Sequence, residues 1–185
     1  MALLSGRAAA VLVLVSGLLL QPAAARAQEG AERPEYAVKS AYLVNFLTYT
    51  TWPDSVLGPG DPLRLCIMGT DPFGDFLGEV SEGRSIHGHP LRVVQVDRVV
   101  EADRCHAGFI AERNRIAARV WLDRLAARPV LTIGEGGEFL GAGGMIALVL
   151  EARTVRFDVN APAMNAAGLS LSSRVLRLAR NAPGD

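Results

Sequence analysis

The chain has 185 residues, of which 50% are hydrophobic, and its 19 basic residues balance its 19 acidic ones. This length suffices for one domain with a single core, and a neutral balance provides no global field for holding nucleic acid. Nucleic acid is therefore not expected as a partner.

The first 27 residues predict a secretory signal peptide. Arg7 supplies a positive start, Ala8–Leu20 is an apolar run, and Ala25-Arg26-Ala27 provides small residues at a cleavage site. The alternative is a retained N-terminal anchor, although this apolar run is too short to span a membrane. Cleavage would remove two of the 19 basic residues, Arg7 and Arg26, and leave residues 28–185 as one exported domain with a net charge of −2.

Apolar residues at helical spacing predict a helix over Glu35–Thr50. One stripe holds Val38, Ala41, Tyr42, Phe46 and Tyr49, and a second apolar side holds Leu43, Val44 and Leu47. Two apolar sides predict a helix that is covered on more than one face. Trp52-Pro53 follows and ends it, because the residue before a proline is disfavoured in the helical conformation.

The stretch CIMGTDPFGDFL (Cys66–Leu77) connects a predicted strand at Leu63–Gly69 to a predicted helix over residues 72–80. Gly69 and Gly74 have the separation with which a Walker phosphate loop begins. However, Asp75 follows Gly74 where that loop requires lysine, and Pro72 removes a backbone N–H donor. The stretch therefore predicts a corner in which Asp71 caps the helix and Pro72 occupies its first position.

The following segments alternate between strands and helices. Strands are predicted at Ile86–Val96, after a turn at Gly88, and at His106–Ala111 and Pro129–Gly134, with an amphipathic helix at Arg115–Ala127 that has Ile116, Val120, Leu122 and Leu125 among its apolar positions. The glycine-rich segment Gly136–Gly144 has room for at most one helical turn. This alternation indicates a mostly parallel sheet that is covered on both faces.

The C-terminal third adds a hairpin and two short helices. Met145–Glu151 and Thr154–Asn160 predict antiparallel strands joined by a tight turn at Ala152-Arg153. A helix over Pro162–Ala167 is stopped by Gly168, and Ser172 or Ser173 caps a last helix that ends near Arg180. The expected fold is a three-layer α/β/α domain with a mostly parallel sheet and a C-terminal antiparallel hairpin strand.

Cys66 and Cys105 are the two cysteines of the chain, and an even count in an exported protein indicates one disulfide. Two buried free thiols are the alternative. His87, His89 and the adjacent Cys105-His106 suggest a metal site, but the turn at Gly88 breaks the strand alternation that such a site would need. Residues 28–185 contain neither G-x-S-x-G nor H-E-x-x-H. The sequence therefore predicts no catalytic residues, no cofactor and no metal.

Seven segments of the chain, taken in order, resemble those of YfiR-family periplasmic proteins. They are 41–53 (AYLVNFLTYTTWP), 66–77 (CIMGTDPFGDFL), 87–96 (HGHPLRVVQV), 105–110 (CHAGFI), 130–151 (VLTIGEGGEFLGAGGMIALVLE), 155–160 (VRFDVN) and 168–180 (GLSLSSRVLRLAR). The resemblance implies a periplasmic regulator rather than an enzyme. It would bind and restrain the periplasmic domain of an inner-membrane diguanylate cyclase or sensor kinase, and so control cyclic di-GMP and biofilm formation.

The resemblance also implies a homodimer and a structural disulfide between Cys66 and Cys105, while a second cysteine pair of some members is absent. Carried over residue by residue, the resemblance implies partner-binding residues at Ile146, Asp158 and Met164. Two apolar anchors beside a carboxylate would suit an interface hot spot. Burial of Ile146 and Met164 in the core is the alternative.

A second function remains open on sequence grounds. The chain would then be a periplasmic small-ligand-binding module that feeds a sensor kinase or transporter, with Tyr42, Asn45, Tyr49 and Trp52 near a pocket at one edge of the sheet.

Overall fold

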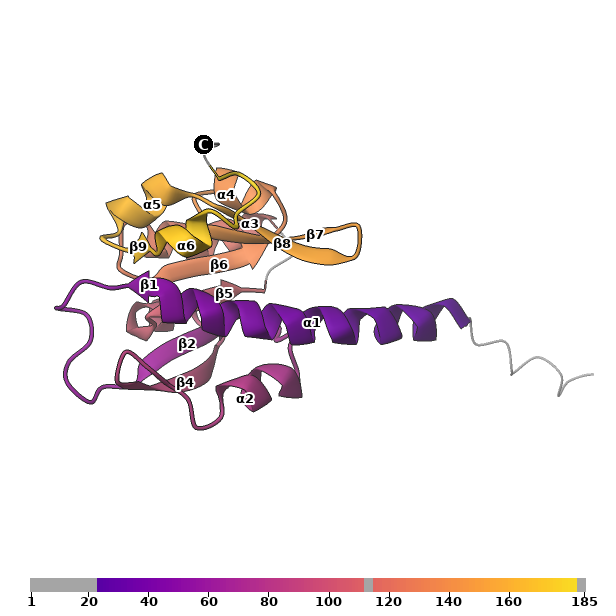
Figure 1. The fold of residues 1–185 in the computed structure, drawn as a ribbon, viewed down its shortest axis with the longest axis horizontal. Coiled ribbons are helices and arrows are strands. Elements are labelled where there is room, and N and C mark those ends of the chain that lie inside the picture. The colour runs from indigo at the N-terminus through magenta and orange to yellow at the C-terminus, as the bar shows by residue number, and fades with distance from the viewer. Residues whose placement is uncertain (1–22, 112–114, 183–185) are drawn as a thin grey trace, which may run out of the picture.

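The computed structural model describes residues 23–111 and 115–182 (Figure 1). The strands are β1 (Thr50–Thr51), β2 (Leu63–Met68), β3 (Ser85–Ile86), β4 (His89–Val96), β5 (Ala107–Ile110), β6 (Leu131–Glu135), β7 (Ile146–Glu151), β8 (Thr154–Val159) and β9 (Ser170–Leu171). The helices are α1 (Ala23–Tyr49), α2 (Asp75–Ser81), the 3-10 helix η1 (Val99–Arg104), α3 (Arg115–Leu125), α4 (Glu138–Gly141), α5 (Ala161–Ala166) and α6 (Ser173–Leu176). None of the described helices is long and apolar enough to cross a membrane.

Seven of these strands form one sheet in the order β3-β4-β2-β5-β6-β7-β8. The five inner strands are parallel, while β3 and β8 pair antiparallel at the two edges. The hairpin of β7 and β8 turns at Ala152 (φ 46°) and Arg153 (φ 66°), as the tight turn predicted, and positive φ at both residues is typical of a type I′ turn.

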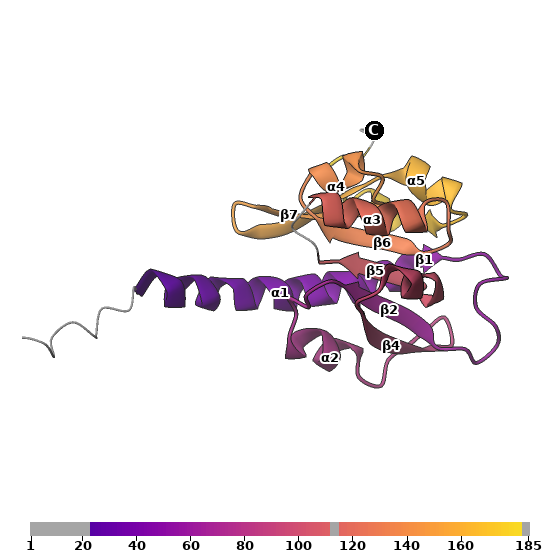
Figure 2. The same ribbon diagram turned by 180° about the vertical axis from the view of Figure 1, so that it is seen from behind.

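Helices cover both faces of this sheet. α1 lies in front of the sheet in Figure 1, and α3 and α4 lie in front of it in the opposite view (Figure 2). Each face of the sheet has its own hydrophobic core, and alternate residues of β2 point into one or the other. Leu65 and Ile67 pack into the core on the side of α1, and Cys66 and Met68 pack into the core on the side of α3. The predicted three-layer α/β fold is confirmed.

The packing of α1 corrects the expectation of two covered sides. Leu43, Val44 and Leu47 are buried, whereas Val38 and Tyr49 are 46% and 44% exposed. The helix crosses one face of the sheet only. Phe46 of the first stripe is therefore buried together with the second apolar side, while the rest of that stripe is half-buried or exposed. The predicted signal peptide falls mainly on residues 1–22, which lie outside the described residues, and it remains a prediction.

The corner after β2 differs from the prediction at its helix start. α2 begins at Asp75, and Gly74 (φ 54°) stands at the N-cap position. Asp71 instead accepts a hydrogen bond at Oδ1 from the Phe73 backbone N–H (2.7 Å), and so stabilises a turn before the helix. Phe73 is buried against Phe109, with ring centroids 4.7 Å apart, and this burial requires the chain to turn before the helix begins.

Two contacts that the sequence did not predict connect the end of α1 to the C-terminal segment. β1 pairs antiparallel with β9 in a separate two-stranded sheet, where Thr50 lies opposite Leu171 and Thr51 opposite Ser170. The Ser172 backbone N–H also donates to the Tyr49 carbonyl (2.9 Å). The end of α1 is thus tied to a segment near the C-terminus.

Candidate functional site

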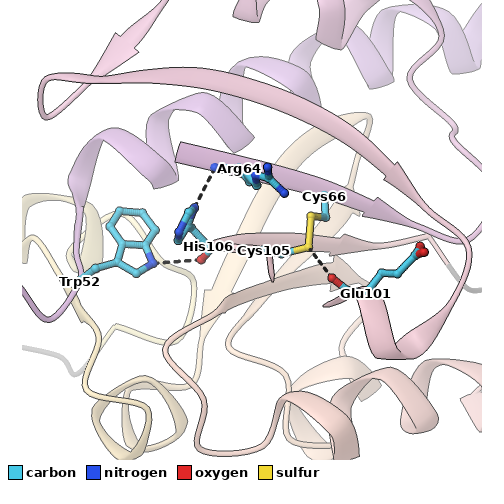
Figure 3. The surroundings of a disulfide bond; sticks show 6 residues. All are labelled: Trp52, Arg64, Cys66, Glu101, Cys105 and His106. Atoms are coloured by element: carbon cyan, nitrogen blue, oxygen red, sulfur yellow. Dashed lines mark hydrogen bonds between the residues drawn. A yellow bond between two sulfur atoms is a disulfide. The ribbon is translucent and has the colours of Figure 1, made fainter. Parts of the chain in front are cut away.

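The predicted disulfide is present between Cys66 on β2 and Cys105, two residues before β5 (Figure 3). The two Cα atoms lie 5.9 Å apart, and both side chains are buried in the layer of α3. The bond links two neighbouring parallel strands near the centre of the sheet. Its place inside the core indicates a structural role.

The four residues predicted to surround a ligand pocket do not share one cavity. Tyr42 is half-buried and donates from its hydroxyl to the Val155 carbonyl (3.2 Å), while Asn45 and Tyr49 are exposed. Trp52 is buried and lines a cleft of about 450 Å³. The other three residues line neither that cleft nor the larger groove described below.

All three histidines of the chain contact the segment that runs from β1 to β2. His87 Nε2 lies 3.2 Å from the Thr50 carbonyl, and His89 Nδ1 lies 2.8 Å from that of Asp61. His106 Nδ1 accepts from the Arg64 backbone N–H (2.9 Å), and the His106 carbonyl accepts from Trp52 Nε1 (2.9 Å) (Figure 3). Within the described residues, no three His, Cys, Asp or Glu side chains are placed to hold a metal ion.

The three predicted partner-binding residues lie inside the domain. Ile146 and Met164 are 0% and 2% exposed and belong to the core beside α1. Asp158 is 7% exposed and accepts two hydrogen bonds from Arg180, at 3.0 Å and 2.7 Å. Hydrogen bonding to Asp158 raises the pKa of Arg180 above its ordinary value. These contacts account for the three residues as structural ones, and their role in partner binding stays a prediction.

A groove of about 1740 Å³ opens at the carboxyl ends of β5 and β6 and along β7. Its walls are mainly aliphatic and come from α3, β5 and β7, including Ile110, Ile116, Val120, Leu148, Val149 and Leu150. Its remaining lining includes Glu35 and Lys39 of α1, Glu135, and the glycines around α4. Ligands of open α/β sheets bind outside the carboxyl ends of the strands, at the point where the strand order reverses. The groove lies at that edge of the sheet, but beside the reversal between β2 and β5 and not at it.

A charged cluster lies at one end of the groove. Lys39 is 4% exposed, and its Nζ forms ion pairs with Glu35 and with Glu135 Oε1, the latter at 2.6 Å. The ammonium also lies 4.4 Å from the centre of the Tyr36 ring, a cation–π contact. Burial alone would lower the pKa of Lys39, but hydrogen bonds to Glu135 and Glu35 outweigh it and raise the pKa. Lys39 is therefore a permanent cation at this site.

The charged cluster of Lys39, Glu35 and Glu135 was not predicted from the sequence. Lys39 is the only lysine among the 19 basic residues, and a single lysine in an arginine-rich chain was the available signal. Its second carboxylate, Glu135, is 96 residues away and could not be assigned without the strand order. Gly137 and Gly141 lie beside this cluster in the groove and carry no side chains. A Cβ at either position would meet no atom within 4 Å, so the space next to them is open.

The fold is an α/β domain with a groove at the carboxyl ends of parallel strands, the edge at which open α/β sheets bind ligands. The DUF4154 family model, described as YfiR/HmsC-like, matches residues 36–180. The chain belongs to this YfiR/HmsC-like family, and the resemblance found in the sequence is confirmed. The family suggests a periplasmic regulatory protein rather than an enzyme.

Similarity to solved structures is distant. A conserved domain protein from Vibrio cholerae O1 biovar El Tor shares 10% identity at a TM-score of 0.46, with 64% of this chain and 54% of that one covered. An ABC domain in complex with L-Trp from Streptococcus pneumoniae shares 10% identity at a TM-score of 0.44, with 63% and 54% covered. The chain thus spans about half the length of each, and these likenesses carry no argument about function.

Proposed function

We propose that this protein is an exported periplasmic regulator that binds and restrains the periplasmic sensor domain of an inner-membrane signalling protein. The favoured partner is a diguanylate cyclase, so that release of the regulator would raise cyclic di-GMP and favour biofilm. The observation that carries the proposal is the family match over residues 36–180, which covers almost the whole described domain. The protein would act as a homodimer.

Two further observations support export to the periplasm. Residues 1–27 have the pattern of a cleavable signal peptide, and a buried disulfide suits an oxidising compartment. Sequencing the N-terminus of the protein recovered from a periplasmic extract tests this part of the proposal. A start at Gln28 is expected, whereas an intact N-terminus on membrane-bound protein would contradict it.

The regulatory role is tested by deleting the gene and measuring cyclic di-GMP. Loss of a restraining protein is expected to raise cyclic di-GMP and biofilm, and a plasmid copy should reverse both effects. In parallel, the protein purified from the periplasm should bind, in calorimetry, the periplasmic domain of a membrane diguanylate cyclase or sensor encoded beside it. Unchanged cyclic di-GMP together with no association with any neighbouring membrane sensor would refute the proposal.

A second candidate function is a small-ligand-binding module that feeds a sensor kinase or transporter. The cleft of about 450 Å³ beside Trp52, His87 and His89 favours it, because this volume lies within the range of small-molecule sites. A thermal-shift screen of periplasmic metabolites tests it. A stabilising compound whose effect disappears in Trp52→Phe would support the module, and the absence of any shift would argue against it.

A further inference from the structure

We propose that the groove at the carboxyl ends of β5 and β6 is the docking surface for an amphipathic segment of the partner protein, with aliphatic side chains on one face and a basic residue beside them. This inference rests on the proposed function, since it names the surface through which the regulator would hold its partner. The basic residue would meet the carboxylates of Glu35 and Glu135.

Exposed aliphatic side chains lie on the rim of the groove. Ile116 and Val120 lie one turn apart on α3 and are 78% and 51% exposed, and Leu150 on β7 is 51% exposed. All three line the same groove. Aliphatic residues that gather around one groove, with polar residues beside them, are typical of a protein-binding surface. The same helix buries Trp121 and Leu125 on its other side, so its fold does not require Ile116 and Val120 to be apolar.

The charge of the groove identifies the polar part of the occupant. Glu35 and Glu135 share the single cation of Lys39, which leaves the cluster with a formal charge of −1. The two carboxylates are 18% and 30% exposed, so a ligand can reach them, whereas the ammonium is buried. Among the described lining residues, the other basic one is Arg119, which pairs with Asp123 at 2.7 Å. A lysine or arginine of the occupant would balance the cluster, and an acidic group would be repelled.

The size and floor of the groove favour a peptide over a metabolite. Its volume of about 1740 Å³ exceeds the roughly 300–1,000 Å³ of small-molecule pockets. Gly137 has a helical φ of −65°, and Gly141 lies within α4 without a positive φ, so neither backbone requires glycine. Side chains at these positions would nevertheless project into the groove. The glycines thus leave the groove open at this point, and an amphipathic helix can lay its apolar face into an apolar groove of this kind.

The test uses the protein purified from the periplasm and a fluorescent 18-residue helical peptide with leucine on one face and arginine beside it. A second peptide carries glutamate in place of arginine. Binding is measured by anisotropy for the wild type, for Gly141→Leu, which fills the groove, and for Val120→Glu, which places charge on its rim. The matched controls are Gly78→Leu on α2 and Val100→Glu on η1, both exposed and outside the groove.

We expect the wild type to bind the arginine peptide at least tenfold more tightly than the glutamate peptide. Both groove variants should weaken that binding at least tenfold, and both controls should stay within twofold. Glu135→Gln should reduce the preference for arginine over glutamate. Equal binding of the two peptides, or equal binding by groove and control variants whose thermal melts show a folded protein, would overturn the inference.

The same variants are then tested against the periplasmic domain of the neighbouring cyclase. If the wild type binds no such domain, the proposed function fails, while the peptide measurement still decides the role of the groove. If the wild type binds and the groove variants bind as the controls do, the proposed function stands and the inference fails. A small molecule retained by the wild type in native mass spectrometry, and lost in Gly141→Leu, would assign the groove to a ligand and also overturn the inference.

Discussion

Lys39 and Glu135 form an ion pair at 2.6 Å between Nζ and Oε1, although 96 residues separate them in the sequence. The pair joins α1 to the carboxyl end of β6, and Glu35 shares the same ammonium from one turn earlier on the helix. The buried cation therefore adds a polar tie between α1 and the sheet to the apolar packing of the helix.

Replacing Lys39 by methionine tests this dependence. The variant leaves Glu35 and Glu135 facing each other without a cation, and removal of one partner of a buried pair costs several kcal/mol. Because both carboxylates are partly exposed, we expect a loss of about 2 kcal/mol in the free energy of unfolding by urea at pH 7. Adding Glu35→Gln and Glu135→Gln to the variant should recover part of this loss. Unchanged stability in Lys39→Met would contradict the role assigned to the pair.

His106 should make the stability of the domain depend on pH. Burial and the neighbouring charge of Arg64 lower the pKa of His106 below its ordinary value of 6.5. The unfolded chain therefore takes up a proton first as the pH falls, so the contribution of the neutral imidazole is fully present above pH 6.5 and declines below it. Protonation at Nδ1 would also end the hydrogen bond from the Arg64 backbone N–H.

The measurement is a series of urea unfolding curves between pH 8 and pH 5. We expect His106→Gln to flatten the decline below pH 6.5. An identical decline in wild type and His106→Gln would show that other groups cause it.

The disulfide should contribute strongly to stability because it closes a loop of 39 residues. In the loop-entropy account, such a link lowers the conformational entropy of the unfolded chain and so raises the free energy of unfolding by about 4 kcal/mol. We expect the Cys66→Ala, Cys105→Ala double variant to unfold at a lower temperature by 10 °C or more, about the shift that 4 kcal/mol gives in a domain of this size. Wild type treated with a reductant should move in the same direction, while reductant should not shift the double variant.

The turn between β7 and β8 offers a stabilising change. Ala152 and Arg153 both have positive φ, which costs roughly 1–2 kcal/mol for an ordinary L-residue. Asn-Gly is the preferred pair in such a turn. The Ala152→Asn, Arg153→Gly double variant should therefore gain about 1 kcal/mol or more in thermal unfolding. A loss of stability would show that the turn does not hold this conformation in solution.

Asp158 separates a structural role from a partner-binding one. Its carboxylate accepts two hydrogen bonds from Arg180 and is 7% exposed. If its role is structural, Asp158→Asn and Arg180→Gln should lower the midpoint of urea unfolding alike, and the double variant should add little more. A variant of Asp158 that keeps the wild-type midpoint but loses binding to the cyclase domain would instead support the role that the family resemblance implies.

The sequence predicted the order and type of the main strands and helices because their periodic patterns are local. The tight turn at Ala152-Arg153 and the strand at Leu63–Gly69 illustrate this. Which side of a helix meets the core is a different matter. Val38 and Tyr49 are as apolar as residues that are buried, and only the position of α1 over the sheet decides that they face solvent.

The groove could not be predicted from the sequence either, because it also depends on how the elements are arranged in space. Its described lining comes from six elements, and Glu35 and Glu135 meet at Lys39 only after β6 is placed beside β5. The predicted pocket at Tyr42, Asn45, Tyr49 and Trp52 used residues at and just beyond the end of one helix, and the burial of each depends on how that helix lies on the sheet. Phe73 shows a similar limit, since its burial against Phe109 moves the start of α2 away from the position that Pro72 favours.

The pairing of β1 with β9 has a consequence for how the chain matures. A polypeptide that is released N-terminus first presents Thr50 and Thr51 long before Ser170 and Leu171 arrive. The two-stranded sheet therefore closes only when synthesis and delivery of the chain are nearly complete, and contacts so distant in sequence form slowly. A polypeptide truncated before Ser170 would leave the end of α1 without its lock, and quality-control proteases could distinguish it from the finished protein.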